Sequence, residues 1–146
     1  RLRQWFLNPR LEGRISDELL LDLFEDHRSQ PLVRYLLARR LLERRRYAAA
    51  SRLLQTLTIE SLPSDDFGFE AYRVWGEALY FLGRYGEAER LFERLAQQYA
   101  SQPEGVRRQV DEWRARCRWR QLHRTRAGLF FFGPGLFHWL RQVRAS

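Results

Sequence analysis

The sequence predicts an all-α fold, a short stack of helical hairpins, from two related patterns. Between residues 70 and 102, apolar and small side chains recur at i, i+3, i+4 and i+7 on two successive segments, the spacing of one helix face. Gly83 lies between these segments and suits the left-handed residue that ends a helix. The stretch therefore predicts two antiparallel helices, and related spacings occur in the preceding part of the chain.

The residues of this hairpin follow a recognisable order. They are Tyr72, Trp75-Gly76 and Leu79 on the first helix, Gly83-Arg84-Tyr85 at the turn, and Ala88, Phe92 and Leu95 on the second. This order resembles the tetratricopeptide repeat (TPR) family. Leu95 stands where a small residue is usual, and the closing proline comes late, at Pro103. The resemblance implies a short α-solenoid of TPR-like hairpins, with Gly76 and Ala88 where the two helices cross.

A less regular copy of the pattern occupies residues 31–58, and the better copy occupies residues 69–102. The first copy supplies Pro31 at its start and then Leu37-Ala38, Leu41, Tyr47, Ala50, Leu54 and Leu57. Tyr47 and Tyr85 are 38 residues apart, against about 34 in the family. The excess predicts a polar loop over residues 59–69, in which Asp65 or Asp66 caps a helix starting near Gly68 or Phe69. Arg34 departs from the family, which has a large apolar residue there.

The repeats are expected to have a helix on either side, which gives a domain of residues 16–126. Ser16 can cap an N-terminal helix that continues to about His27. Pro103 opens a C-terminal capping helix, residues 103–126, which covers the open end of the second repeat. Its apolar stripe comprises Val106, Val110, Trp113, Cys117 and Leu122. Residues 1–15 form a separate segment, which either docks its aromatic side chains on the first helix or belongs to a membrane-adjacent region.

Composition limits the class of protein. The net charge is +8, and residues 103–146 hold 10 arginines against 3 acids, whereas residues 1–102 hold 16 against 15. Any anionic partner is therefore expected at the C-terminal third. The chain has one cysteine, so no internal disulfide is expected. It has no methionine and begins with Arg1, so we expect a fragment or a mature product of a longer protein. No apolar run reaches the roughly 20 residues of a membrane-spanning helix.

Residues 127–146 form an apolar aromatic C-terminal segment that is interrupted by Gly133-Pro134-Gly135. Three interpretations stay open. The segment turns back and packs on the helices, or it lies in a membrane interface with arginines at the headgroups, or it binds another protein or a second copy of the chain. The residues that would insert into an interface are Phe130, Phe131, Phe132, Phe137 and Trp139.

The sequence contains no motif that would support an enzyme, a metal site or a cofactor. His27, His123 and His138 are scattered, and no glycine-rich phosphate loop, HExxH or GxSxG motif is present. The expectation is a protein without catalytic activity.

The resemblance implies a partner-binding groove along the first helix of each hairpin. The family positions that face this groove fall on Leu32, Tyr35, Arg39 and Leu42, then on Glu70, Arg73, Glu77 and Tyr80, and the capping helix adds Arg107, Asp111 and Arg114. This mixture suits an extended peptide or a helix with acidic and apolar side chains. Arg39 and Glu77 replace the asparagine with which chaperone-tail binders of the family hold a terminal carboxylate, which argues against that ligand.

The expected function is a protein–protein interaction scaffold. Arginine-rich, lysine-free TPR modules resemble those of bacterial envelope and exopolysaccharide-export assemblies, which implies a cytoplasmic chain at the inner face of a bacterial membrane. The alternative is direct binding to an anionic surface through Arg108, Arg116, Arg118, Arg120, Arg124 and Arg126. Membrane headgroups are favoured over nucleic acid, because Trp113 lies on the expected buried stripe and is poorly placed to stack on bases.

Overall fold

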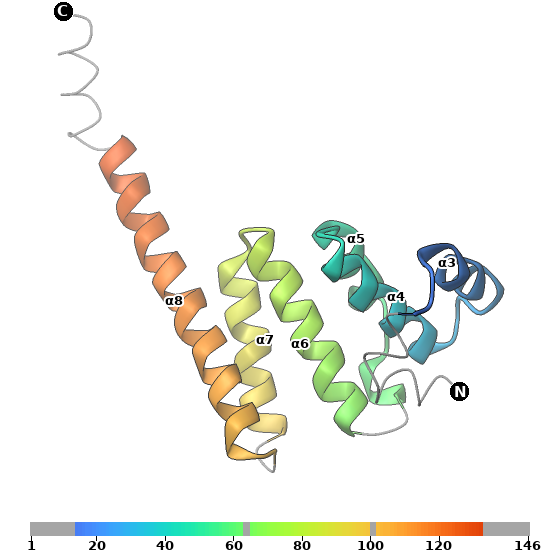
Figure 1. Ribbon diagram of the computed structural model, residues 1–146. Coiled ribbons are helices and arrows are strands. Elements are labelled where there is room, and N and C mark those ends of the chain that lie inside the picture. Colours follow the sequence, from blue (N-terminus) through green and yellow to red (C-terminus); the bar gives the residue numbers. More distant parts are fainter. Residues whose placement is uncertain (1–13, 63–64, 100–101, 133–146) are drawn as a thin grey trace, which may run out of the picture.

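The computed structural model describes residues 14–62, 65–99 and 102–132, and within these ranges the regular structure is entirely helical. In chain order the elements are α3 (Asp17–Asp26), α4 (Pro31–Glu43), α5 (Tyr47–Gln55), the 3-10 turn η1 (Ile59–Ser61), α6 (Asp65–Phe81), α7 (Tyr85–Gln98) and α8 (Glu104–Phe132). The helices follow one another across the molecule in that order, with α3 at one end of the stack and α8 at the other (Figure 1). The all-α prediction is therefore confirmed for these residues.

The two hairpins, α4–α5 and α6–α7, close with the same turn. In the second, the amide of Gly83 donates to the Tyr80 carbonyl at 2.9 Å and the amide of Arg84 donates to the Leu79 carbonyl at 2.9 Å. The equivalent bonds of the first run from Arg45 to Leu42 and from Arg46 to Leu41. Both patterns are Schellman motifs, which need a left-handed residue after the helix. Gly83 has φ 80°, as predicted, and Arg45 has φ 60°.

The start of α3 is as predicted. The Leu19 amide donates to Ser16 Oγ at 3.1 Å, so Ser16 caps the helix. Asp17 accepts from Arg40 Nη1 at 2.6 Å and from Arg44 Nε at 3.1 Å, which joins the first turn of α3 to α4. Residues 1–13, which include the aromatic part of the predicted N-terminal segment, lie outside the described residues.

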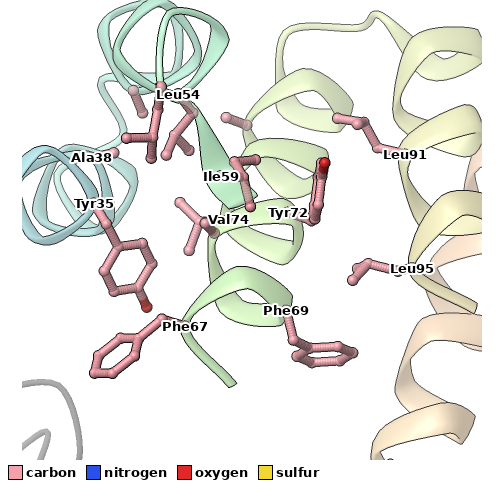
Figure 2. Packing of buried hydrophobic residues seen from close by; sticks show 14 of the residues in the cluster. Tyr35, Ala38, Leu54, Ile59, Phe67, Phe69, Tyr72, Val74, Leu91 and Leu95 are labelled. Carbon is pink, nitrogen blue, oxygen red and sulfur yellow. The ribbon is translucent and has the colours of Figure 1, made fainter. Parts of the chain in front are cut away.

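The hairpin α6–α7 is held together by close packing at Gly76. A Cβ at this position would lie 2.7 Å from Phe92 Cζ, so only glycine allows the Phe92 ring to lie against α6. Phe92 and Ala88 are both fully buried, as the crossing of two helices at small residues predicts. Buried side chains from α4, α5, η1, α6 and α7 form one continuous core (Figure 2).

The connection between the hairpins differs from the predicted polar loop. Ile59 and Leu62 of the η1 region are buried, and so are Phe67 and Phe69. The helix α6 begins at Asp65, three to four residues earlier than expected, so both aspartates stand inside its first turn and neither precedes the helix as a cap. The prediction was wrong because Phe67 and Phe69 bury apolar surface against the core, which extends the helix toward the N-terminus.

Arg34, the departure from the family pattern, bridges the two helices of the first hairpin. Its guanidinium donates to the carbonyl oxygens of Arg28 and Leu53 at 3.3 Å each and to Thr56 Oγ1. The Arg34 side chain therefore hydrogen-bonds to the backbone near the end of α5, whereas an apolar side chain at this position could only pack against that helix.

The helix α8 is longer than the predicted capping helix, because it continues past residue 126 to Phe132. Val110 and Cys117 are buried and Trp113 is half-buried, as the stripe predicts. Leu122 is 53 % exposed, so its assignment to the stripe was wrong. Leu122 lies about 140° around the helix from Cys117 and so faces away from α7. Gln121 beside it still donates to Glu89 of α7. The C-terminal part of α8 extends past the helices it packs on (Figure 1).

Candidate functional site

An arginine between two glutamates lies at the centre of α6. Arg73 Nη2 lies 2.5 Å from Glu70 Oε2, and its Nη1 donates to Glu77 Oε2. All three side chains are less than one-third exposed. Burial lowers the pKa of Arg73, but the hydrogen bonds and charge of Glu70 outweigh it and leave the pKa raised, so the guanidinium stays charged. Burial raises the pKa of Glu77, and Arg73 opposes that shift.

Beside this triad, α6 and α8 meet in a cluster of aromatic rings and guanidinium groups. The Trp113 ring stacks on Phe92 at 5.6 Å between centroids and meets Tyr80 edge-on at 5.2 Å. The Arg116 guanidinium lies 4.8 Å from the centroid of Trp113, and Arg120 Nε donates to the Tyr80 hydroxyl at 3.2 Å. Phe81, which is 50 % exposed, contacts Tyr80 and Trp113 at the edge of the cluster. We call Tyr80, Phe81, Trp113, Arg116 and Arg120 the α6–α8 cluster.

The helix α4 contributes less to this face than the family positions imply. Tyr35 is fully buried in the core, so its prediction as a groove residue is corrected (Figure 2). Burial raises the pKa of the Tyr35 phenol to about 12. The Arg39 guanidinium lies 5.6 Å from the Tyr35 ring centroid and remains partly exposed above it. Leu32 and Leu42 are partly buried against the core.

On α8, the residues that contact Tyr80 of α6 are not the ones at the family groove positions. Arg114 lies 4.0 Å from Glu93 and 3.4 Å from Asp111, on the side that packs on α7. Arg107 and Asp111 line a hollow of about 460 Å³ with Tyr99 and Leu95 of the α7 region. Trp113 and Arg120 contact Tyr80 of α6, and Arg116 lies over the Trp113 ring. The prediction of Arg114 as a groove residue is therefore corrected, because Trp113 packs on Phe92 and so sets the rotation of α8. Arg107 and Asp111, which share their hollow with Phe69 of α6, stay predictions.

The predicted basic surface is partly neutralised by α7. Arg118 Nε lies 2.7 Å from Glu89 Oε1 and its Nη2 lies 3.7 Å from Glu93 Oε1. Within α8 itself, Arg108 lies 3.8 Å from Glu104. Burial raises the pKa of Glu89, but the hydrogen bonds that Glu89 accepts from Arg118 and Gln121 outweigh this effect and leave the pKa lowered. Arg116 and Arg120 belong to the α6–α8 cluster. The side chains of Arg124, Arg126 and Phe130 to Phe132 lie outside the described part, as do Phe137 and Trp139.

Sequence reasoning missed a second groove, which lies between α5 and α7 with α6 as its floor. Its volume is about 440 Å³, and Trp75 and Leu79 form the floor while Arg90 and Arg94 lie along the α7 side. The groove exists because α5 packs chiefly on α4 and α6 and leaves space before α7, an arrangement of distant helices that no local residue pattern indicates.

Within the described residues, no three His, Cys, Asp or Glu side chains come together as a metal site would require. Cys117 is buried, and burial raises the pKa of its thiol to about 11, so it stays protonated at neutral pH. Among the helices of the described ranges, none combines the length and the apolar character needed to cross a membrane.

Comparisons with protein-family models, curated proteins and solved structures found no match.

Proposed function

We propose that the chain is a non-enzymatic protein-interaction module that resembles the TPR family. It binds a peptide or subunit on the face where Arg39 of α4, the charged triad of α6 and the α6–α8 cluster lie. The partner belongs to a membrane-associated assembly of the kind in which similar arginine-rich modules occur.

The α6–α8 cluster is the observation that carries this proposal. Tryptophan, tyrosine and arginine dominate the energetics of protein interfaces, because they combine large contact area with hydrogen bonding. Here Phe81 and the guanidinium groups of Arg116 and Arg120 are exposed, whereas Trp113 beneath them is fixed by its stacking on Phe92. A fixed ring with exposed cations around it is preorganised, which lowers the entropy cost of binding.

The charges of this face define the chemistry of the partner. Arg73 with Glu70 and Glu77 carries one net negative charge, so the positive charge of the cluster comes from Arg116 and Arg120. A partner segment with carboxylates for these arginines and an apolar side chain for Phe81 and Trp113 fits this face.

Direct binding to an anionic surface has less support. Arg114 and Arg118 point to carboxylates of α7, which reduces the positive charge that α8 offers to headgroups or phosphates. A protein partner with a few well-placed carboxylates suits the remaining arginines better than an extended anionic layer does.

The test uses a double variant of the cluster. Arg116→Glu with Arg120→Glu should reduce capture of the natural partner from host extract by at least about tenfold, because buried charge pairs at interfaces contribute about 2–5 kcal/mol. The control is Gln97→Glu with Gln98→Glu on the exposed end of α7, which makes the acidic change away from the cluster.

Both double variants should keep the circular dichroism spectrum of the wild type. Equal capture by the cluster variant and the control would contradict the proposed face, and capture lost in both would show a general charge effect.

A further inference from the structure

The second groove, between α5 and α7, has an apolar floor on the side of α6 that faces away from the charged triad. Trp75 and Leu79 form this floor, and the Trp75 ring is only half-buried. At about 100° per residue, Trp75 lies about 200° around the helix from Arg73, and Leu79 lies about 200° around it from Glu77. The groove is therefore separate from the face on which the proposed function rests.

The α5 side of the groove carries neutral polar groups. Ser51 lines the groove and is only 4 % exposed, and within the described ranges its hydroxyl makes no hydrogen bond. Most buried hydroxyls have a hydrogen-bond partner, so an exception needs an explanation. Gln55, four residues later on the same face of α5, is exposed beside it. Together they can hydrogen-bond to the backbone of a peptide that lies in the groove.

The α7 side of the groove is basic. It carries three arginines, Arg84, Arg90 and Arg94, against the single carboxylate of Glu87. Arg84 Nε lies 2.7 Å from Glu87 Oε2, so these two charges balance. Arg90 is exposed and has no ion pair or hydrogen bond within the part of the chain that the structure describes.

The third arginine is partly balanced. The Arg94 guanidinium lies 5.8 Å from the centroid of the Tyr72 ring, and the Tyr72 hydroxyl donates to Glu60 Oε1 at 3.1 Å. Arg94 and Glu60 thus meet at one tyrosine. The surplus positive charge of the groove comes chiefly from Arg90.

We propose that the second groove binds an extended acidic segment of another protein. A bulky apolar side chain of the segment covers Trp75 and Leu79, and a carboxylate beside it pairs with Arg90. From Arg84 to Arg94 the groove follows α7 for about 15 Å at 1.5 Å per residue. An extended chain advances about 3.3 Å per residue, so about four or five residues fill this length.

Charge excludes the two terminal segments of this chain as the occupant. Residues 1–13 hold three arginines and one glutamate, and residues 133–146 hold two arginines and no acid. Either segment would bring a basic sequence to Arg90, and like charges placed together oppose binding. The groove therefore calls for an acidic sequence from outside the chain.

The experiment selects ligands from random heptapeptides displayed on phage. The target is the full chain with Arg116→Glu and Arg120→Glu, which disables the α6–α8 cluster, so the outcome is independent of the proposed function. The selected peptides should combine aspartate or glutamate with leucine, phenylalanine or tryptophan. Fluorescence anisotropy then measures the affinity of synthetic copies, which should decrease as salt rises because Arg90 is exposed.

Three further substitutions in the same background locate the site. Arg90→Glu should weaken binding at least about tenfold by opposing the carboxylate. Ser51→Ala should weaken it about two- to tenfold by removing a hydrogen bond. The matched control, Arg107→Glu, makes the same charge change at the hollow between α7 and α8 and should leave the affinity within about twofold. All variants should keep the circular dichroism spectrum of the wild type.

Four results would overturn the proposal. The selection enriches no peptide that binds above background, or the enriched peptides lack acidic residues. The peptides bind Arg90→Glu as tightly as its parent, or they lose binding in Arg107→Glu instead, which would place the site at the other hollow.

Discussion

At residue 76, a single methyl group decides how closely α6 and α7 pack. An alanine Cβ would lie 2.7 Å and 2.9 Å from two atoms of the Phe92 ring, and Phe92 is itself stacked on Trp113. The ring cannot move away without disturbing α8, so the strain cannot be relieved locally.

Gly76→Ala should therefore lower the free energy of unfolding by about 1–3 kcal/mol, the range for overpacked cores. Urea denaturation measures this change. Gly105→Ala is the control, because a Cβ there meets nothing within 4 Å in the first turn of α8 and should be neutral or stabilising. An unchanged midpoint for Gly76→Ala would contradict the packing described.

Arg45 has a left-handed backbone at the turn where the second hairpin has glycine. A non-glycine residue at φ 60° carries a steric cost of about 1–2 kcal/mol, and the Arg45 side chain is exposed. Arg45→Gly should raise the free energy of unfolding by about 1 kcal/mol by thermal or urea denaturation. The reciprocal change, Gly83→Ala at φ 80°, should lower it by a similar amount. A loss of stability in Arg45→Gly would show that the side chain contributes more than the backbone strain costs.

At the scale of the element, α3 is joined to α4 by Asp17. Hydrogen bonds from Arg44 and Arg40 hold the pKa of Asp17 below its usual value of 3.8. Because the pKa in the folded chain is the lower one, the contribution of this carboxylate to stability is complete above pH 3.8 and decreases as pH falls through the folded pKa.

Asp17→Asn should loosen α3 from α4 at neutral pH, and amide hydrogen exchange should show faster exchange confined to α3. In the wild type, the same local opening of α3 should occur under acid conditions. In Asp17→Asn, the free energy of that opening should be the same at acid and at neutral pH. Exchange in Asp17→Asn equal to that of the wild type at neutral pH would mean that apolar packing of Leu20 alone holds the helix.

At the scale of the whole molecule, stability should decrease from the centre of the stack to its N-terminal end. The helix α6 packs on α4, α5, η1 and α7, whereas α3 packs chiefly on α4. An element with few packed neighbours opens at a lower free energy than one that is packed on several sides.

Native-state hydrogen exchange in increasing urea should therefore show α3 opening first and α6 and α7 opening last. A single opening free energy for all helices would indicate one cooperative unit instead.

The sequence by itself determined the helices, their turns and their small-to-large contacts. Ser16, Pro31 and Gly83 predict helix ends because they act on the backbone within one turn, and Gly76 predicts close packing because it has no side chain. These effects are local, so periodicity and residue type are sufficient to read them. The start of α6 was misjudged for the opposite reason, since burial of Phe67 depends on distant helices.

The tertiary structure alone decided which residues of each helix face outward. Tyr35 is buried because α4 and α6 enclose it, and Trp113 fixes the rotation of α8 through its contact with Phe92. That rotation directs Arg114 to α7 and Arg116 to the side of α6, although both arginines belong to one charged run. The pattern of a helix specifies its apolar stripe, but the side chains of its neighbours determine the angle at which the stripe docks.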